Sequence, residues 1–463
     1  MSKYQPTISS LTSIRDDGSR RFLYPADVKG AYTTRRMIFF AILIAVYALL
    51  PWIQINGQPA VFLDAASRRF HLFGMTFVAQ DFWLVFFIIT GLAFSLFFVT
   101  ALLGRIWCGY ACPQTVFLEG VFRRIERWIE GDAVKRERLA KAPWTPDKIT
   151  RRVIKHGLYL AIALVIAHLF IAYFVSLPAL YAMVRSSPLA NTGVFVWMLI
   201  LTGILYFNFS WFREQLCIII CPYGRLQSAL IDDDSLIIGY DEQRGEPRGK
   251  ATDPNAGHCI DCRRCVDVCP TGIDIRHGLQ MECIGCAACI DACDTIMERL
   301  KRPRGLIRYD SLNGLAGKGK RILRPRIILY TILFFIGVTV FSLSLRTVQP
   351  YTFSAIRMGG GPYFIEETAI RNHFQLRFIN KRTETMTLPV TVSGGDFAIN
   401  YRLPENPVVL APGEERIVPL FVTLPREHFQ GMFSLTVTTG QENGRTTRRR
   451  LQFLGPDLPP SLP

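Results

Sequence analysis

The hydrophobic residues of this chain gather in five long runs separated by polar segments. Each run has about 18 or more residues, enough for a helix to cross roughly 30 Å of hydrocarbon. The five predicted spans are residues 37–53, 82–103, 157–177, 194–212 and 327–345. They form two helical hairpins and a single fifth helix, so the pattern predicts a multi-pass membrane protein.

After the fifth run, the pattern changes to short segments in which apolar and polar residues alternate. These segments are residues 374–380, 387–394, 397–403, 416–424, 433–439 and 449–455, and Gly, Pro and Asn separate them. Several short alternating segments predict an antiparallel β-sandwich, here of immunoglobulin-like type. Nothing in this tail looks catalytic, so we expect it to dock a partner.

The composition agrees with this interpretation. Half of the 463 residues are hydrophobic and the mean hydropathy is +0.23, which is too apolar for an ordinary soluble enzyme. The polar 36-residue segment before the first span also argues against a cleaved signal peptide.

The placement of basic residues predicts the orientation of the chain. Segments 1–36, 104–156 and 213–326 hold 37 of the 53 Lys and Arg residues, whereas loops 54–81 and 178–193 hold three. The positive-inside rule therefore places the N-terminus in the cytoplasm and the tail outside it. The net charge of +16 is then explained by topology and by contact with anionic membrane lipid. No nucleic-acid-binding motif is present, so no nucleic-acid partner is predicted.

The clearest chemical signal is a doubled cysteine motif. Residues 259–270 read CIDCRRCVDVCP and residues 283–293 read CIGCAACIDAC. The spacing C-x2-C-x2-C-x3-C is that of bacterial two-cluster ferredoxins, in which the fourth cysteine binds the other cluster. It assigns one [4Fe–4S] cluster to Cys259, Cys262, Cys265 and Cys293, and the other to Cys283, Cys286, Cys289 and Cys269.

Zinc is the main alternative for paired CxxC motifs, but eight cysteines in this pattern favour clusters. All twelve cysteines lie in or beside segments predicted to be cytoplasmic, where thiols stay reduced. Small residues at 285, 287 and 288 would let the backbone approach a cluster closely. Asp294 stands where a proline usually follows the last cysteine, which changes no ligand.

Together these features predict five parts. They are a cytoplasmic N-terminal segment (1–36), a four-helix membrane region (37–231), a cytoplasmic connector with an α+β two-[4Fe–4S] ferredoxin domain (232–326), a fifth transmembrane helix (327–345) and an all-β immunoglobulin-like domain (346–463).

Two shorter motifs, WCGYACP and LCIIICP, each place a Cys-x3-Cys-Pro where an apolar run ends. If each pair lies on a helix, its two cysteines share a face and can bind one ion. Packed hairpins would bring the pairs together into a soft thiolate site for Cu(I) or another cluster. Buried structural cysteines are the alternative, but two matching pairs favour a functional site at Cys108, Cys112, Cys217 and Cys221.

Three other features carry weaker signals. His168, within the third span, can relay protons, contact a quinone, ligate a haem or make a helix-to-helix hydrogen bond. For Asn208, near the inner end of the fourth span, a helix-to-helix hydrogen bond is likewise expected. The segment from Val121 to Leu139 mixes apolar and basic residues at helical spacing, which predicts a helix on the membrane surface.

The order of these motifs resembles a known family. DGSRRFLYPADVKGAY, WCGYACPQ, CIIICPYGRLQ, the doubled ferredoxin motif and a cysteine-free β tail follow one another as in the FixG/CcoG/RdxA accessory proteins of cbb3-type cytochrome c oxidase. The resemblance implies a bacterial inner-membrane protein that reduces Cu(II) to Cu(I) for assembly of that oxidase. It also implies that the four paired cysteines handle copper, with oxidase subunits or copper-delivery factors as partners.

Three functions therefore remain open. The leading hypothesis is a cupric reductase that receives electrons from a cytoplasmic donor through two [4Fe–4S] clusters. The second is a quinol-linked electron conduit to a periplasmic reductase, as in membrane components with similar C-x3-C-P pairs. The third is a non-enzymatic assembly scaffold for the oxidase, whose clusters only sense redox state.

Overall fold

The computed structural model describes residues 20–78, 81, 83–319, 321, 323–382, 384–394, 399–440 and 446–456. The chain forms two compact units. The first comprises Met1–Trp52 and Leu84–Ser342, and the second comprises Ile53–Trp83 and Leu343–Pro463. The segment between the first two spans therefore belongs to the same unit as the tail, which the hydrophobic pattern alone does not predict.

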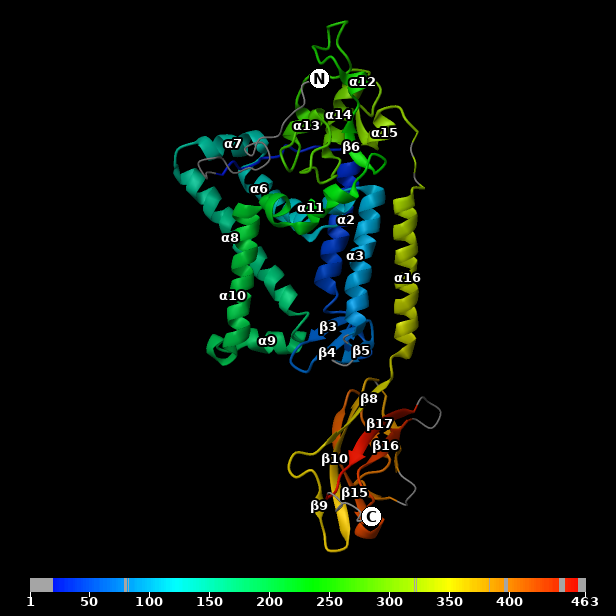
Figure 1. The fold of residues 1–463 in the computed structure, drawn as a ribbon. Helices are drawn as coiled ribbons and strands as arrows, with labels where there is room; N and C mark the ends of the chain where they lie inside the picture. Colours follow the sequence, from blue (N-terminus) through cyan, green and yellow to red (C-terminus); the bar gives the residue numbers. More distant parts are fainter. Residues whose placement is uncertain are drawn as a thin grey trace. The chain divides into compact units, whose positions relative to one another are not determined.

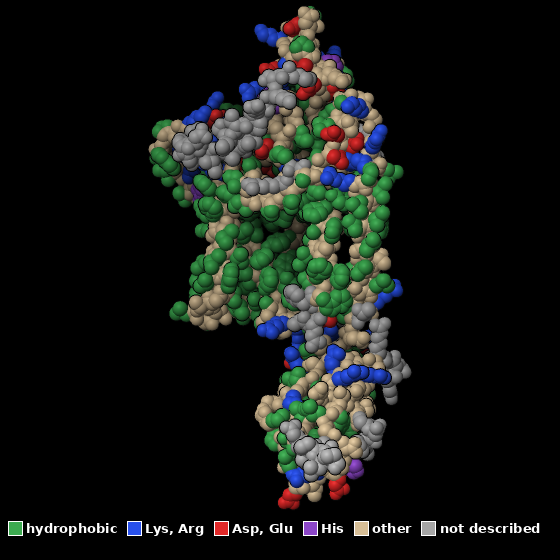
Figure 2. All heavy atoms as spheres, in the orientation of Figure 1, with side chains coloured by type: hydrophobic (Ala, Val, Ile, Leu, Met, Phe, Trp, Pro, Cys, Tyr) green, Lys and Arg blue, Asp and Glu red, His purple; other side chains and the backbone are tan. Residues whose placement is uncertain are grey.

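Each of the five predicted spans corresponds to a helix. Within the described residues, five helices are long and apolar enough to cross a membrane: Ala31–Leu49, Trp83–Leu103, Pro146–Ile171, Pro188–Phe212 and Pro325–Arg346. They contain helices α2 (Ala31–Leu49), α3 (Trp83–Leu103), α8 (Pro146–Ile171), α10 (Thr192–Phe207) and α16 (Pro325–Thr347). Hydrophobic side chains form a band over these helices in Figure 2. The chain is a membrane protein.

Several span boundaries differ from the predicted ones, and local signals explain two of the differences. Helix α2 ends at Leu49 rather than at residue 53, since the residue before Pro51 is disfavoured in a helix. Helix α8 begins at Pro146, eleven residues before the predicted start. Thr145 caps its first turn, accepting a hydrogen bond from the Lys148 backbone N–H, and proline suits the first helical position.

Helices α8 and α10 run side by side in the first unit, and α9 lies at one end of this pair (Figure 1). Shorter helices connect the spans. They are α4 (Ile106–Tyr110), α5 (Pro113–Phe117), η2 (Leu118–Phe122), α6 (Arg123–Glu130), α7 (Ala133–Lys141), α9 (Leu177–Arg185), η3 (Pro188–Asn191), η4 (Asn208–Phe212), η5 (Leu216–Ile220) and α11 (Pro222–Leu230).

The predicted helix over residues 121–139 is in fact two helices. Gly131, with φ +90°, separates α6 from α7. Three charged side chains of α6, those of Arg123, Glu126 and Glu130, are buried in the protein, whereas Arg124 is exposed. Glu126 pairs with Arg213 and with Arg136 (3.5 Å), and Arg123 pairs with Glu214 (3.0 Å). Buried counter-ions therefore replace water around Glu126 and Arg123, which the apolar–basic pattern alone does not show. The position of this segment on the membrane surface stays a prediction.

The ferredoxin segment packs on the same unit. Its elements are β6 (Ile237–Tyr240), α12 (Glu242–Gly245), α13 (Arg264–Asp267), η6 (Ile275–His277), α14 (Ala288–Arg299), β7 (Ile307–Asp310) and α15 (Leu312–Leu315), with β6 and β7 antiparallel. Asp291 of α14 joins this segment to the first span. Its carboxylate accepts hydrogen bonds from the Thr33 backbone N–H and hydroxyl, both at 2.7 Å, and so caps the first turn of α2.

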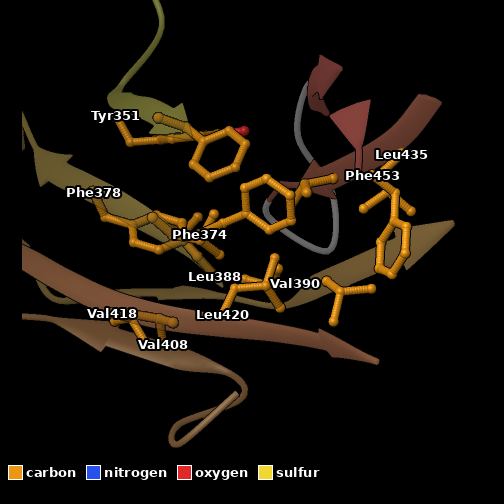
Figure 3. Packing of buried hydrophobic residues seen from close by; sticks show 14 of the residues in the cluster. Tyr351, Phe374, Phe378, Leu388, Val390, Val408, Val418, Leu420, Leu435 and Phe453 are labelled. Atoms are coloured by element: carbon orange, nitrogen blue, oxygen red, sulfur yellow. The ribbon is translucent and has the colours of Figure 1, made fainter. Parts of the chain in front are cut away.

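In the second unit, the tail folds into sheets around one apolar core. Strands β13, β15, β10 and β8 form one sheet, with β9 also paired to β10; β12, β16 and β17 form a second, and β11 pairs with β14. Figure 3 shows the core, where Phe374 and Phe378 of β10 lie near Tyr351 and Leu420. The strands are β8 (Tyr351–Arg357), β9 (Phe364–Ile365), β10 (Ala369–Asn380), β11 (Met386–Leu388), β12 (Val390–Ser393), β13 (Asn400–Arg402), β14 (Val408–Leu410), β15 (Glu415–Pro425), β16 (Phe433–Thr439) and β17 (Thr447–Phe453), with η7 at Arg426–His428.

All six predicted strand segments contain a strand, although residues 395–398 of the third lie outside the described residues. The 53–83 segment adds β1 (Gln54–Ile55), β2 (Gln58–Pro59), β3 (Val61–Asp64), β4 (Arg69–Leu72) and β5 (Met75–Val78), the last three in one antiparallel sheet. A buried ion pair joins it to the tail, between Lys381 Nζ and Asp81 Oδ2 at 2.6 Å.

Candidate metal centres

The eight ferredoxin cysteines line two small cavities inside the first unit. One cavity is lined by Cys259, Cys262, Cys265 and Cys293, and the other by Cys265, Cys269, Cys283, Cys286 and Cys289. Apart from the shared Cys265, these are the two ligand sets that the spacing assigns, each completed by the fourth cysteine of the other motif. Four thiols and apolar neighbours around each cavity fit a cubane cluster.

Burial and neighbouring sulfurs act in the same direction on these thiols. Burial raises the pKa of Cys293 to about 12, and the nearby Cys265, Cys259 and Cys262 contribute to the rise. Burial likewise raises the pKa of Cys283 to about 12, with Cys286 and Cys269 as further causes. Without a metal these groups are neutral thiols at pH 7, so cluster binding must displace protons.

The two cysteine loops have the same backbone shape. In the first loop, Asp261 and Arg263 have φ of 53° and 56°. In the second, the equivalent residues Gly285 and Ala287 have φ of 67° and 61°. Left-handed residues at the same two positions turn each loop so that a short helix begins directly after it. Gly285 has a second constraint, since a Cβ there would lie 3.0 Å from the carbonyl oxygen of Arg105.

The structure explains why Asp294 replaces the usual proline. Helix α14 continues for several residues beyond Cys293, so position 294 is inside a helix, where proline would break it. The Asp294 carboxylate instead accepts a hydrogen bond of 2.9 Å from the Gly305 backbone N–H. The residue after Cys269, by contrast, is Pro270, which lies outside the described helices.

The two C-x3-C-P pairs do not lie on continuous helices, contrary to the geometry expected from the sequence. Cys108 is in α4, but Cys112 is extended (ψ 125°) and precedes α5; Cys217 is in η5, and Cys221 is extended (ψ 110°) before α11. The prolines cause this break. Each disfavours a helical conformation in the cysteine before it and starts a new helix at its own position.

The structure nevertheless brings the four thiols together. Burial raises the pKa of Cys217 to about 12, and Cys112, Cys108 and Cys221 raise it further through their charge. Burial raises the pKa of Cys108 to about 11, with Cys112 and Cys221 acting in the same direction. Since charge effects of this kind act over short distances, the two pairs lie near each other, and binding of an ion by all four stays a prediction. These four cysteines are called the thiol cluster below.

Gln227, which sequence reasoning missed, holds one of these thiols. Its side chain is fully buried, its Nε2 lies 3.4 Å from Cys108 Sγ and its Oε1 lies 3.6 Å from the same sulfur. Arg105 also ties the two motifs together by donating a 2.8 Å hydrogen bond to the carbonyl of Gly224. The only sequence signal for Gln227 is its position six residues after Cys221 in CPYGRLQ.

The thiol cluster adjoins the second ferredoxin cavity. A Cβ added to Gly109, the residue after Cys108, would lie 2.8 Å from the carbonyl oxygen of Ile284 and 3.0 Å from the Cα of Cys286. Cys108 also packs against the apolar group that contains Cys286 and Cys289. Because glycine has no side chain, the backbone at Gly109 is in direct contact with the backbone of Ile284 and Cys286.

In the described part of the chain, no three His, Cys, Asp or Glu side chains are grouped tightly enough to hold a single metal ion. The ferredoxin cysteines do not form such a group either. This agrees with cluster binding, because each iron of a cubane takes one thiolate and the four ligands need not converge on one atom.

The weaker candidates lie apart from one another. His168 Nδ1 donates a 2.8 Å hydrogen bond to the Leu164 carbonyl of its own helix, and the side chain lines a cavity with residues of α9 and α10. Asn208 instead pairs with Gln114, donating from Nδ2 to Oε1 at 2.7 Å. These two amides line an apolar cavity of about 600 Å³ between α2, α5, α8 and α10, and Figure 2 shows a hollow among the hydrophobic side chains of the spans.

Comparisons with known proteins agree with the assignment of iron–sulfur domains and of an immunoglobulin-like domain at the C-terminus. Residues 212–312 match the family model of a 4Fe–4S dicluster domain, residues 82–131 that of a 4Fe–4S binding domain, and residues 341–456 that of an IG-like fold at the C-terminus of FixG. The protein RdxA of Cereibacter sphaeroides is 37% identical over 391 residues, which cover 80% of this chain and 82% of RdxA. This chain belongs to the FixG/RdxA family.

Other members of the FixG/RdxA family match over a similar extent. The nitrogen fixation protein FixG of Rhizobium meliloti is 34% identical, over 89% of this chain and 88% of its own. RdxB of Cereibacter sphaeroides is 34% identical over 86% and 87%. A crystal structure of a FixG-related protein from Vibrio parahaemolyticus aligns with 23% of this chain and 97% of its own at 17% identity, with a TM-score of 0.22.

These findings define this FixG/RdxA protein at a coarse level. It is a membrane protein with 4Fe–4S domains and an immunoglobulin-like all-β domain at its C-terminus, and it is an iron–sulfur electron-transfer protein. The match over residues 82–131 includes Cys108 and Cys112, and the match over 212–312 includes Cys217 and Cys221. Both thiol pairs thus lie in segments that match iron–sulfur domain models.

Proposed function

We propose that this FixG/RdxA protein reduces Cu(II) to Cu(I) at the thiol cluster and so serves the assembly of a cbb3-type cytochrome c oxidase. The observation that carries the proposal is the contact between Gly109 and the Cys286 loop. It brings the motif that contains Cys108 directly beside the loop of a predicted cluster ligand, Cys286, which supports electron transfer between the two. The proposal includes a bacterial inner-membrane location, with the N-terminus and ferredoxin domain in the cytoplasm and the β domain in the periplasm.

When bound, the two [4Fe–4S] clusters would supply electrons one at a time. The reaction at the thiol cluster is Cu²⁺ + e⁻ → Cu⁺, and it breaks no covalent bond. Thiolate sulfur binds Cu(I) in preference to harder ions, so the four cysteines favour the reduced product. Gln227 keeps Cys108 in place with both ends of its amide, and Arg105 holds the two motifs together.

Protons accompany copper binding. Because burial raises the pKa of Cys108 to about 11 and that of Cys217 to about 12, both are thiols before the ion arrives. Each sulfur that binds copper releases its proton to water or to a nearby group. Cys112 sits at the start of α5, where the backbone N–H groups of Thr115 and Gln114 oppose the rise in pKa that burial causes.

The test is anaerobic addition of Cu(II) to dithionite-reduced, desalted protein, with Cu(I) measured by a chromogenic chelator. The Cys108→Ser, Cys217→Ser double variant should lose Cu(I) formation while keeping its iron and its cluster absorbance. Met432→Leu, which removes an exposed sulfur from the β domain, is the matched control and should behave like wild type. Undiminished Cu(I) formation by the double variant would refute the assigned site.

Iron analysis distinguishes the other use of the four thiols. Two clusters require about eight iron atoms per chain, whereas a further cluster on the thiol pairs would add about four that the Cys108→Ser, Cys217→Ser variant loses. Copper reduction at free thiols requires the iron content to be the same in wild type and variant.

A second candidate function is a quinol-linked electron conduit, which the apolar cavity favours. Its volume of about 600 Å³ is in the range of small-molecule sites, and it is lined by Ala111, Pro113 and Leu216 from the two thiol motifs. The Gln114–Asn208 amides are its polar groups. This function predicts reduction of the clusters by a short-chain quinol, and an Asn208→Leu variant should slow that reduction without affecting reduction by dithionite.

A further inference from the structure

Of the twelve cysteines, Cys262 is the exposed one. It belongs to the first ferredoxin cavity, with Cys259, Cys265 and Cys293. In the second cavity, Cys286 is buried and its loop is covered by Gly109. The ferredoxin domain therefore presents one cavity to solution and the other to the thiol cluster, so an external electron donor has access near Cys262.

The charges beside Cys262 are mainly positive. Arg263 and Arg264 follow it directly, line the first cavity and are exposed. Neither has an ion pair within the described residues. Arg276 lines the same cavity, but it is already paired with Asp274 (2.6 Å) and Asp261.

Neighbouring segments add to this charge. Lys250 is exposed, and the N–H of the preceding Gly249 donates to the Cys259 carbonyl at 3.3 Å, which places this basic residue beside the loop. Three exposed carboxylates lie near these groups: Asp261, which is paired with Arg276, Asp267 in α13, and Asp253, three residues after Lys250. Among the described residues, the three basic groups without an ion pair (Arg263, Arg264 and Lys250) thus outnumber the two carboxylates without one (Asp253 and Asp267).

We propose that Cys262, Arg263 and Arg264 form a cationic entry face that docks an acidic one-electron carrier protein, with an iron–sulfur or flavin centre. This rests on the proposed electron-transfer function and names the class of donor. In each encounter the reduced carrier loses one electron and the FixG/RdxA protein gains it, and no bond breaks and no proton moves. Opposite charges raise the rate of encounter and make it fall with ionic strength.

The experiment uses the full-length, cluster-loaded protein in detergent and a reduced plant-type [2Fe–2S] ferredoxin as the acidic probe. Stopped-flow absorbance follows reoxidation of the carrier at several salt concentrations, without copper. The Arg263→Glu, Arg264→Glu variant should react about tenfold or more slowly than wild type at low salt, and the difference should shrink at high salt. Binding of the oxidised carrier, measured by biolayer interferometry, should weaken in parallel.

Two controls separate docking from damage. Lys318→Glu with Arg321→Glu makes the same change in net charge at exposed positions on the segment that contacts Asp234, and it should leave the rate near wild type. The methyl viologen radical cation, a small positive donor, should reduce the Arg263→Glu, Arg264→Glu variant at least as fast as wild type. The iron content must match in all proteins.

A wild-type rate that is independent of salt, or a charge-reversed variant that matches wild type at low salt, would overturn the proposal. So would equal slowing by both double variants, which would indicate a net-charge effect. Failure of the copper proposal is distinguishable, because the Cys108→Ser, Cys217→Ser variant contains no change at the entry face and should react normally with the carrier.

Discussion

Replacement of Gly109 by alanine tests the contact between the thiol cluster and the ferredoxin loop. Gly109 is helical and has no positive φ, so helix propensity alone predicts that alanine would stabilise the protein by about 1 kcal/mol. The structure predicts the opposite sign. The new Cβ would lie 2.8 Å from the Ile284 carbonyl oxygen and 3.0 Å from both the nitrogen and the Cα of Cys286.

The magnitude follows from those distances. Ordinary contacts of a Cβ begin near 3.4 Å, so the Ile284 carbonyl must move by roughly 0.6 Å, and these are backbone atoms that cannot rotate away. Overpacking of this kind costs about 1–3 kcal/mol, which exceeds the gain in helix propensity. We expect a net loss of up to about 2 kcal/mol, or a melting temperature lower by up to several degrees.

Thermal unfolding in detergent, followed by tryptophan fluorescence, measures this effect, and iron analysis after mild heating reports on the second cluster. Gly203→Ala in α10 is the matched control, because no atom lies within 4 Å of its new Cβ. It should melt at or slightly above the wild-type temperature. If Gly109→Ala also melts at or above wild type and retains its iron, the direct contact between thiol motif and cluster loop is wrong.

Three further predictions concern the groups that hold the fold together. Asp291→Ala should lower the melting temperature by several degrees, because the N–H and hydroxyl of Thr33 lose their acceptor at a cost of about 1–3 kcal/mol. The control Asp253→Ala, on an exposed loop, should leave the melting temperature unchanged. Burial alone would raise the pKa of Glu126, but Arg213 and the nearby Lys155 and Arg136 lower this pKa to about 2. The ionised Glu126 therefore stabilises the folded state fully above the unfolded pKa near 4.5, and this stabilisation is lost as the pH falls toward 2. The melting temperature of wild type should therefore fall more steeply than that of Glu126→Gln between pH 5 and 3, and equal slopes would contradict the ion network. Lys381→Met should destabilise the second unit by roughly 3 kcal/mol, because it leaves Asp81 as a buried charge without its partner, and Asp81→Asn in the same chain should recover part of that loss in a calorimetric scan.

Much of this architecture can be predicted from short-range patterns. A helix that crosses the hydrocarbon core of a membrane needs about 20 apolar residues, and this length requirement alone locates all five spans. The ferredoxin motif is equally local, because three of four ligands lie within seven residues and the helix after them directs the fourth to the other cavity. The grouping of Cys259, Cys262 and Cys265 with Cys293 therefore follows from spacing before any coordinates are known.

Contacts between distant segments depend on the tertiary structure. The C-x3-C-P pairs were expected to share helix faces, but each proline starts a new helix. Contacts between remote residues, such as Arg105 with Gly224 and Cys108 with Gln227, hold the two motifs together. The apolar–basic pattern of α6 indicates a helix but not its partners, and only the tertiary structure pairs the buried Glu126 with Arg213 and the buried Arg123 with Glu214. The periodic pattern of apolar and polar residues indicates that one face of a helix differs from the other. Whether that face contacts water, lipid or a counter-ion depends on which remote segment packs against it.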